Sequence, residues 1–170
     1  MPRNIEIKAR LQDLVALEPR VKAIADQGPT PIAQDDTFFR SANGRLKLRE
    51  FADGKGELIY YRRADKAGPK ESFYVIAPVD APGPLRETLT LAYGIEGRVK
   101  KHRTLYLIGQ TRVHLDRVDG LGDFLELEVV LADSEATEHG QKIAIELLDR
   151  LQVDRSKCLE GAYLDMLRTK

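Results

Sequence analysis

Alternating polar and apolar side chains at the start of the chain constrain its fold more than any other sequence feature. From Asn4 onward the alternation is strict, and successive residues of a β-strand point to opposite faces. Asn4, Glu6, Lys8 and Arg10 therefore share one face of a predicted strand, and apolar residues share the other. Taken alone, this pattern is typical of an amphipathic strand whose charged face lies in water.

The same alternation recurs in later segments and predicts about eight strands. Most of these are joined by short turns, such as the one at Asn43 and Gly44, a dipeptide typical of β-hairpins. Helices are predicted over residues 18–28, 84–94, 134–151 and 161–167, and an exposed loop over residues 65–70. Strands joined mainly by hairpins favour an antiparallel α+β fold, and the length fits one domain over residues 1–170.

Charge balance and cysteine content limit the classes of function. The chain has 27 basic and 27 acidic residues, so its net charge predicts neither a nucleic-acid partner nor a membrane surface. Cys158 is the one cysteine, which excludes an internal disulfide and suits a reducing compartment. No segment approaches the roughly 20 apolar residues of a membrane-spanning helix. We therefore expect a cytoplasmic protein.

The charged faces of the strands are predicted to line the inside of a closed barrel. Amphipathic helices need an apolar surface to cover, and the outward faces of such a barrel offer one. Acidic residues dominate the charged face in the first and last strands, and basic residues dominate it in the middle strands. A solvated surface normally interleaves the signs, whereas two poles suit a divalent cation and a polyphosphate. An ordinary sheet with a charged surface stays open as the alternative.

Several segments together resemble the CYTH family, also called the triphosphate tunnel metalloenzymes. NIEIKAR is similar to the ExExK signature of this family, and the resemblance continues in order through QDDTFF, GRLKLRE, YYRRAD, VKKHRTLY, LDRVDGLGDFLELE and GAYLDML. It implies an eight-stranded antiparallel β-barrel with helices packed outside, which holds a triphosphate and a divalent metal ion. The overall resemblance is strongest to the class IV adenylyl cyclases.

The resemblance also implies roles for individual residues. The implied metal ligands are Glu6, Glu126 and Glu128, and the implied ion is Mg²⁺ or Mn²⁺. The residues implied to bind the substrate are Lys8, Lys47, Arg49, Arg62, Lys101, Arg103 and Arg112. Those implied in catalysis are Lys8, Arg103 and Asp116. Asn4 stands where the family has its first glutamate, so the metal pole has one carboxylate fewer.

This resemblance favours an enzyme that converts ATP to cyclic AMP and pyrophosphate. A triphosphatase for inorganic triphosphate, thiamine triphosphate or a nucleotide would use the same set of residues. A non-catalytic binder of nucleotide or polyphosphate is the third reading, and Asn4 favours it. His114 shares the charged face of its strand and is expected to be a polar lining residue. The expected partner is a small-molecule triphosphate, and a homodimer is compatible with the sequence.

Overall fold

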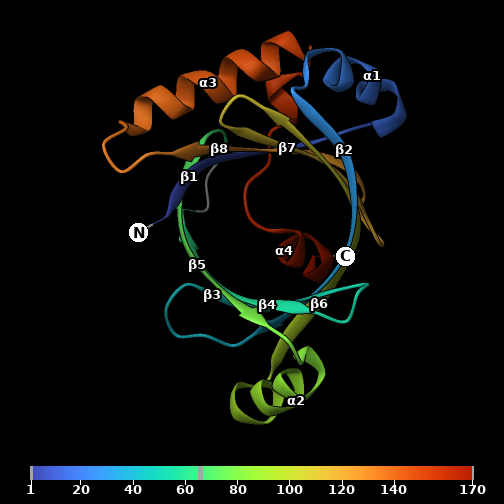
Figure 1. Cartoon of the computed structure of the whole chain (residues 1–170), viewed down its shortest axis with the longest axis vertical. Coiled ribbons are helices and arrows are strands. Elements are labelled where there is room, and N and C mark those ends of the chain that lie inside the picture. The colour runs from blue at the N-terminus through green and yellow to red at the C-terminus, as the bar shows by residue number, and fades with distance from the viewer. Residues whose placement is uncertain (1, 65–66, 170) are drawn as a thin grey trace.

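The fold is a closed barrel of eight antiparallel strands (Figure 1). The computed structural model describes residues 2–64 and 67–169. In chain order the elements are β1 (Arg3–Arg10), α1 (Leu14–Ile24), β2 (Gln27–Phe39), β3 (Arg45–Phe51), β4 (Gly56–Arg63), β5 (Lys70–Val79), α2 (Pro82–Tyr93), β6 (Ile95–Ile108), β7 (Thr111–Val118), β8 (Gly122–Leu131), α3 (Thr137–Arg150), a 3₁₀ turn (Arg155–Lys157) and α4 (Tyr163–Arg168). The predicted fold class is confirmed.

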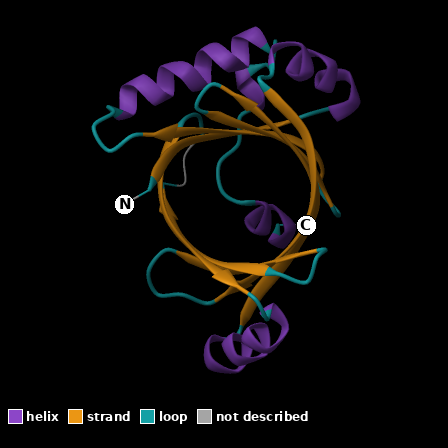
Figure 2. Cartoon of the chain, viewed as in Figure 1, coloured by secondary structure: helices purple, strands orange, loops and turns teal. Residues whose placement is uncertain are grey.

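Pairing of β1 on both of its edges closes the barrel. This strand pairs with β8 along its whole length, from Arg3 opposite Leu131 to Arg10 opposite Phe124, and with β5 at its start. Around the barrel the strand order is β1-β5-β4-β3-β2-β6-β7-β8. Two connections, from β1 to β2 and from β5 to β6, join strands that are not neighbours, and each of them contains a helix (Figure 2).

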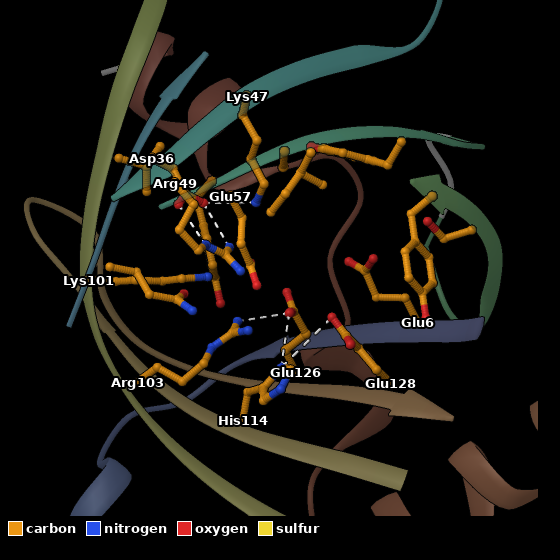
Figure 3. Close-up of a pocket in the computed structure, with 18 of the residues that line it drawn as sticks. Glu6, Asp36, Lys47, Arg49, Glu57, Lys101, Arg103, His114, Glu126 and Glu128 are labelled. Carbon is orange, nitrogen blue, oxygen red and sulfur yellow. Dashed lines mark hydrogen bonds and ion pairs between the residues drawn. The ribbon is translucent and has the colours of Figure 1, made fainter. Parts of the chain in front are cut away.

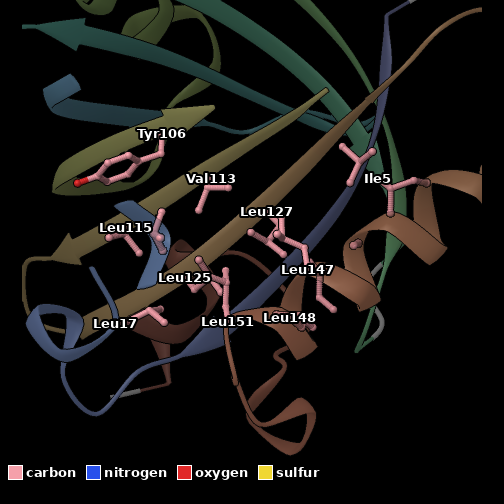
Figure 4. Packing of buried hydrophobic residues seen from close by; sticks show 14 of the residues in the cluster. Ile5, Leu17, Tyr106, Val113, Leu115, Leu125, Leu127, Leu147, Leu148 and Leu151 are labelled. Carbon is pink, nitrogen blue, oxygen red and sulfur yellow. The ribbon is translucent and has the colours of Figure 1, made fainter. Parts of the chain in front are cut away.

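The main hydrophobic core lies outside the barrel wall, between the strands and their covering helices. Ile5, Val113 and Leu127 point outward and are fully buried there. Leu17 of α1 and Leu147 of α3 belong to the same cluster (Figure 4). A smaller cluster joins α2 to the outer faces of β2 and β3. The apolar half of the alternation is therefore turned toward the helices, as the sequence predicts.

Helix α4 covers one end of the barrel (Figure 1). Tyr163 of α4 packs against Phe38 and Phe124, and its ring lies 4.9 Å from that of Phe124, centroid to centroid. Arg45 fixes the helix by donating hydrogen bonds of 3.0 and 2.7 Å to the carboxylate of Asp165. Apolar packing thus closes this end of the interior.

The first helix begins earlier than predicted. Asp13 caps α1, because its carboxylate accepts a hydrogen bond of 2.8 Å from the backbone N–H of Val15. Pro19 was expected in the first turn but lies inside the helix, which ends at Ile24, well before Gly28. The prediction of a start near residue 18 was wrong because the cap at Asp13 begins the helix and Pro19 is accommodated within it.

The longest described helix, α3, has 14 residues. Within the described ranges, none of the helices combines the length and apolar character that a membrane crossing requires.

The predicted loop over residues 65–70 is described only in part. Residues 65 and 66 lie outside the described residues, and Lys70, the expected last residue of the loop, already belongs to β5.

Replacing Leu127 with alanine tests the position of the core. Leu127 is fully buried under α3, so Leu127→Ala leaves a cavity and is expected to lower the free energy of unfolding by about 2–5 kcal/mol. Urea denaturation followed by circular dichroism measures this. The control is Leu91→Ala, at a side chain that is 82% exposed, with an expected change below about 0.5 kcal/mol. Equal stability of the two variants would contradict the placement of the core.

Candidate active site

A cavity of about 350 Å³ lies inside the barrel. Alternate residues of all eight strands line it, together with Ala162 and Tyr163 at the end that α4 covers. Seven of the described lining residues are basic: Lys8, Lys47, Arg49, Arg63, Lys101, Arg103 and Arg112. Five are acidic: Glu6, Asp36, Glu57, Glu126 and Glu128. The charged interior predicted from the alternation is therefore present (Figure 3).

Strand β4 turns the opposite face inward from the one predicted. Arg62 is exposed on the outside of the barrel, and its neighbour Arg63 lines the cavity. Leu58 lies opposite Leu48, which packs outward under α2, and a period of two from Leu58 directs Arg62 outward as well. The placement of Arg62 at the substrate site was therefore wrong, and Arg63 is the candidate in its place.

Three side chains on β7 and β8 could hold a metal ion. His114, Glu126 and Glu128 each offer one ligand atom, and these atoms lie within 4.8 Å of one another (Figure 3). Burial lowers the pKa of His114 and the charge of Arg103 lowers it further, so the imidazole is neutral at pH 7 and can act as a ligand. Carboxylate oxygens suit Mg²⁺ or Mn²⁺, and imidazole nitrogen suits transition metals. The donor set thus fits one divalent cation.

Both glutamates of this group are held in the ionised form. Burial alone raises the pKa of Glu126, but Lys8 and Arg103, each 2.9 Å from its carboxylate, outweigh burial and hold the pKa well below its usual value. Burial likewise opposes the ionisation of Glu128, and Arg112, 2.8 Å away, helps to lower its pKa. Two anionic ligands are therefore available at neutral pH.

Glu6 faces the same cavity but lies outside the three-residue group. Its carboxylate accepts a hydrogen bond from Arg63 and lies 3.6 Å from Nζ of Lys8. Lys8 also contacts Glu126, so it links two carboxylates. Asn4 lines the cavity on the same strand, and its Oδ1 is buried without a hydrogen-bond partner. Metal binding by Glu6 stays a prediction.

Acidic side chains also occur among the basic ones, so the two predicted poles are not separate. Asp36 on β2 accepts hydrogen bonds from Lys47 at 2.8 Å and from Arg49 at 2.8 and 2.9 Å. Burial raises the pKa of Asp36, but these two cations lower it far below its usual value. Asp36 was not among the predicted site residues, although it alternates with Gln34 in the QDDTFF segment.

Asp116 shares the inward face of β7 with Arg112 and His114 but does not itself line the cavity, and it binds side chains that do. It is fully buried and accepts two hydrogen bonds of 2.6 Å from the guanidinium of Arg103. Lys101 donates a third bond at 3.3 Å and the hydroxyl of Tyr163 a fourth at 2.9 Å. This geometry points to a positioning role for Asp116. Tyr163 was missed because its contact with β7 comes from the far end of the chain, which no local pattern reveals.

The pKa of Lys101 lies well below that of an ordinary lysine. Burial lowers its pKa, and the neighbouring charge of Arg103 lowers it further, to about 7, despite the opposing effect of Asp116. The amine of Lys101 is therefore part protonated and part neutral at physiological pH. Binding of an anion beside it favours the protonated form.

Comparison with known proteins agrees with the fold. The CYTH domain family matches residues 2–163. Adenylate cyclase CyaB of Aeromonas hydrophila is 26% identical over 140 residues, which cover 78% of this chain and 71% of that protein. The structure of a Pyrococcus horikoshii protein has a TM-score of 0.85 at 25% identity, over 95% of this chain and 98% of that chain. A Hippeastrum adenylyl cyclase candidate described as having a dominant triphosphatase activity has a TM-score of 0.71 at 14% identity, covers 99% and 96% of the two chains, and supports the fold alone.

The fold and the cavity define a class of barrel proteins with a charged interior and a group able to hold a divalent ion. This chain belongs to the CYTH domain family, which matches almost its whole length. The family resemblance found in the sequence is thereby confirmed.

Anion binding is expected to depend on the protonation of Lys101. The affinity of the protein for inorganic triphosphate is predicted to fall by up to about tenfold per pH unit above pH 7, because the amine of Lys101 then loses the charge that contacts the anion. Calorimetric titration across this range measures the effect. Lys101→Arg keeps the charge and is expected to flatten the curve, which also corrects for ionisation of the ligand itself. The same pH dependence in both proteins would assign it to another group.

Proposed function

We propose that this protein is a metal-dependent enzyme that acts on a triphosphate, and that it converts ATP to cyclic AMP and pyrophosphate. The observation that carries this proposal is the arrangement of one cavity, with seven basic side chains around a carboxylate–histidine group. The excess of basic over acidic lining residues suits a highly charged anion. The named cyclase among the relatives supports the choice of reaction.

The basic residues of β3 and β6 are proposed to hold the triphosphate. Lys47 and Arg49 project from β3, and Lys101 and Arg103 from β6, on either side of Asp36 and its strand. Their ion pairs with buried carboxylates fix the side chains before a ligand arrives, and such preorganisation lowers the cost of binding. Arg112 and Lys8, which contact the glutamates of the ligand group, join them as substrate-binding candidates.

His114, Glu126 and Glu128 are proposed to hold the divalent ion, Mg²⁺ or Mn²⁺. When bound, such an ion stabilises negative charge on phosphate oxygens as a Lewis acid. The neutral imidazole and the two ionised carboxylates already have the protonation states that this role requires. Glu6 is a further candidate ligand from the same cavity.

In the proposed reaction the ribose 3′ oxygen attacks the α-phosphorus. A new oxygen–phosphorus bond forms, the bond from the α-phosphorus to the bridging oxygen breaks, pyrophosphate leaves, and the hydroxyl proton is released to solvent. Arg103 and Lys8 are proposed to stabilise the charge that develops on the phosphates, and Asp116 to hold Arg103 in place. Hydrolysis would need the same side chains with water as the nucleophile, so a triphosphatase is the second candidate reaction.

A non-catalytic binder is the third candidate, and Asn4 is the observation that favours it. The neutral amide replaces a carboxylate that the family resemblance implies, and it lines the cavity. A homodimer, a cytoplasmic location and a single domain over residues 1–170 stay predictions from the sequence.

Product analysis tests the proposed reaction. The purified protein is incubated with ATP, thiamine triphosphate or inorganic triphosphate in the presence of Mg²⁺ or Mn²⁺, and the products are resolved by chromatography. Cyclic AMP and pyrophosphate from ATP are the expected result. Orthophosphate without cyclic AMP would replace the cyclase with a triphosphatase. Binding of a triphosphate without formation of any product would favour the non-catalytic binder.

Removing one carboxylate tests the ion site independently of turnover. Glu128→Gln is expected to weaken Mn²⁺ binding about tenfold or more, because the ion loses one of two anionic ligands. Binding of the ion alone is measured by electron paramagnetic resonance. The matched control is Glu57→Gln, which removes a cavity carboxylate on β4 outside the ligand group and is expected to leave Mn²⁺ affinity unchanged. Equal losses in both variants would mean that the cavity attracts cations without a defined site.

A further inference from the structure

One wall of the cavity carries a buried polar side chain that the proposed site does not use. Gln34, in the middle of β2, lines the cavity and is only 6% exposed. Its Oε1 is buried without a hydrogen-bond partner. A buried acceptor without a donor is costly, so such an atom marks a place where a ligand can supply one.

The neighbours of Gln34 form a short row across three strands. Gln34 lies opposite Phe51 of β3 on one side and opposite Lys101 of β6 on the other. Directly opposed residues of paired strands have their Cβ atoms within about 5.5 Å, and all three line the cavity. An aromatic ring, an amide and a phosphate-binding candidate therefore lie side by side.

Apolar side chains extend this row on the side away from α4. Ile32 follows the inward alternation of β2 and lies opposite Arg103, and Leu105 follows Arg103 on β6. Ile32, Leu105 and Phe51 are half-buried, and none of them belongs to a described hydrophobic core cluster. Apolar surface that faces a charged cavity without core partners is available to an apolar part of a ligand.

We propose that Gln34, Phe51 and Ile32 form a subsite for the base of a nucleoside triphosphate. This inference rests on the proposed function, because Lys101 and Arg103, beside the subsite, are there assigned to the phosphates. A nucleobase offers a flat apolar face to Phe51 and Ile32 and polar edges to the amide. The exocyclic amino group of adenine is a donor for Oε1 of Gln34, and the amide N–H can pair with a ring nitrogen. Inorganic triphosphate has neither an apolar face for Phe51 and Ile32 nor an N–H donor for Oε1 of Gln34.

Binding of ligands that cannot react tests the subsite. The bis-methylene analogues of ATP and of inorganic triphosphate block both cyclisation and hydrolysis, and calorimetry with Mg²⁺ present gives both affinities. The wild-type protein is expected to bind the ATP analogue about tenfold more tightly, and Gln34→Leu is expected to remove most of this preference while affinity for the triphosphate analogue stays unchanged. Phe51→Leu tests the same subsite without removing a buried polar group, and is expected to reduce the preference as well.

The control is Thr37→Val on the same strand. Thr37 also has a buried oxygen without a partner, but it does not line the cavity, so the preference is expected to remain. Equal affinity of the wild-type protein for both analogues would overturn the base subsite and leave the triphosphate site intact. An equal loss for both analogues in Gln34→Leu would assign Gln34 to phosphate binding instead. Failure of the wild-type protein to bind either analogue would overturn the proposed function and the subsite with it.

Discussion

Charge compensation inside the barrel is the constraint on which the rest of the structure depends. A charged group removed from water costs several kcal/mol unless an opposite charge or hydrogen bonds replace the water. Asp36 and Asp116 are almost completely buried, and each is bound by two cationic side chains. The barrel can therefore turn its charged faces inward and leave the apolar faces to the helices outside. Without these carboxylates, the basic residues of β3 and β6 would repel one another within one cavity.

The sequence was sufficient to predict the wall of the barrel, because the wall follows from a local pattern. Alternation with a period of two separates Glu126 from Leu127 on β8, and the same pattern separates Glu6 from Ile5 on β1. The need of amphipathic helices for an apolar partner then decides which face is outside. The inward positions of Lys47, Lys101 and Arg103 follow from the same argument.

The remaining features depend on contacts that local patterns do not encode. Two adjacent arginines, Arg62 and Arg63, give both faces of β4 a basic residue, so only the register with β3 selects the inner one. Tyr163 reaches Asp116 from the far end of the chain. The pairing of Asp36 with basic residues also depends on the spatial order of β2, β3 and β6, in which β6 is far from the other two along the chain. The interior therefore holds a network of alternating positive and negative side chains in place of the two predicted poles.

The neutral residue at position 4 follows from the same constraint. Asn4 lies opposite Ser72 on β5 and opposite Val130 on β8, and neither of these neighbours carries a charge. Glu6, two residues later, is bound by Arg63 and lies close to Lys8. A carboxylate at position 4 would face the cavity without such cross-strand cations, whereas an amide costs less to bury. An amide at position 4 also adds no negative charge to a cavity in which basic lining residues outnumber acidic ones. In the proposed function this charge balance favours the anionic substrate, at the expense of one metal ligand.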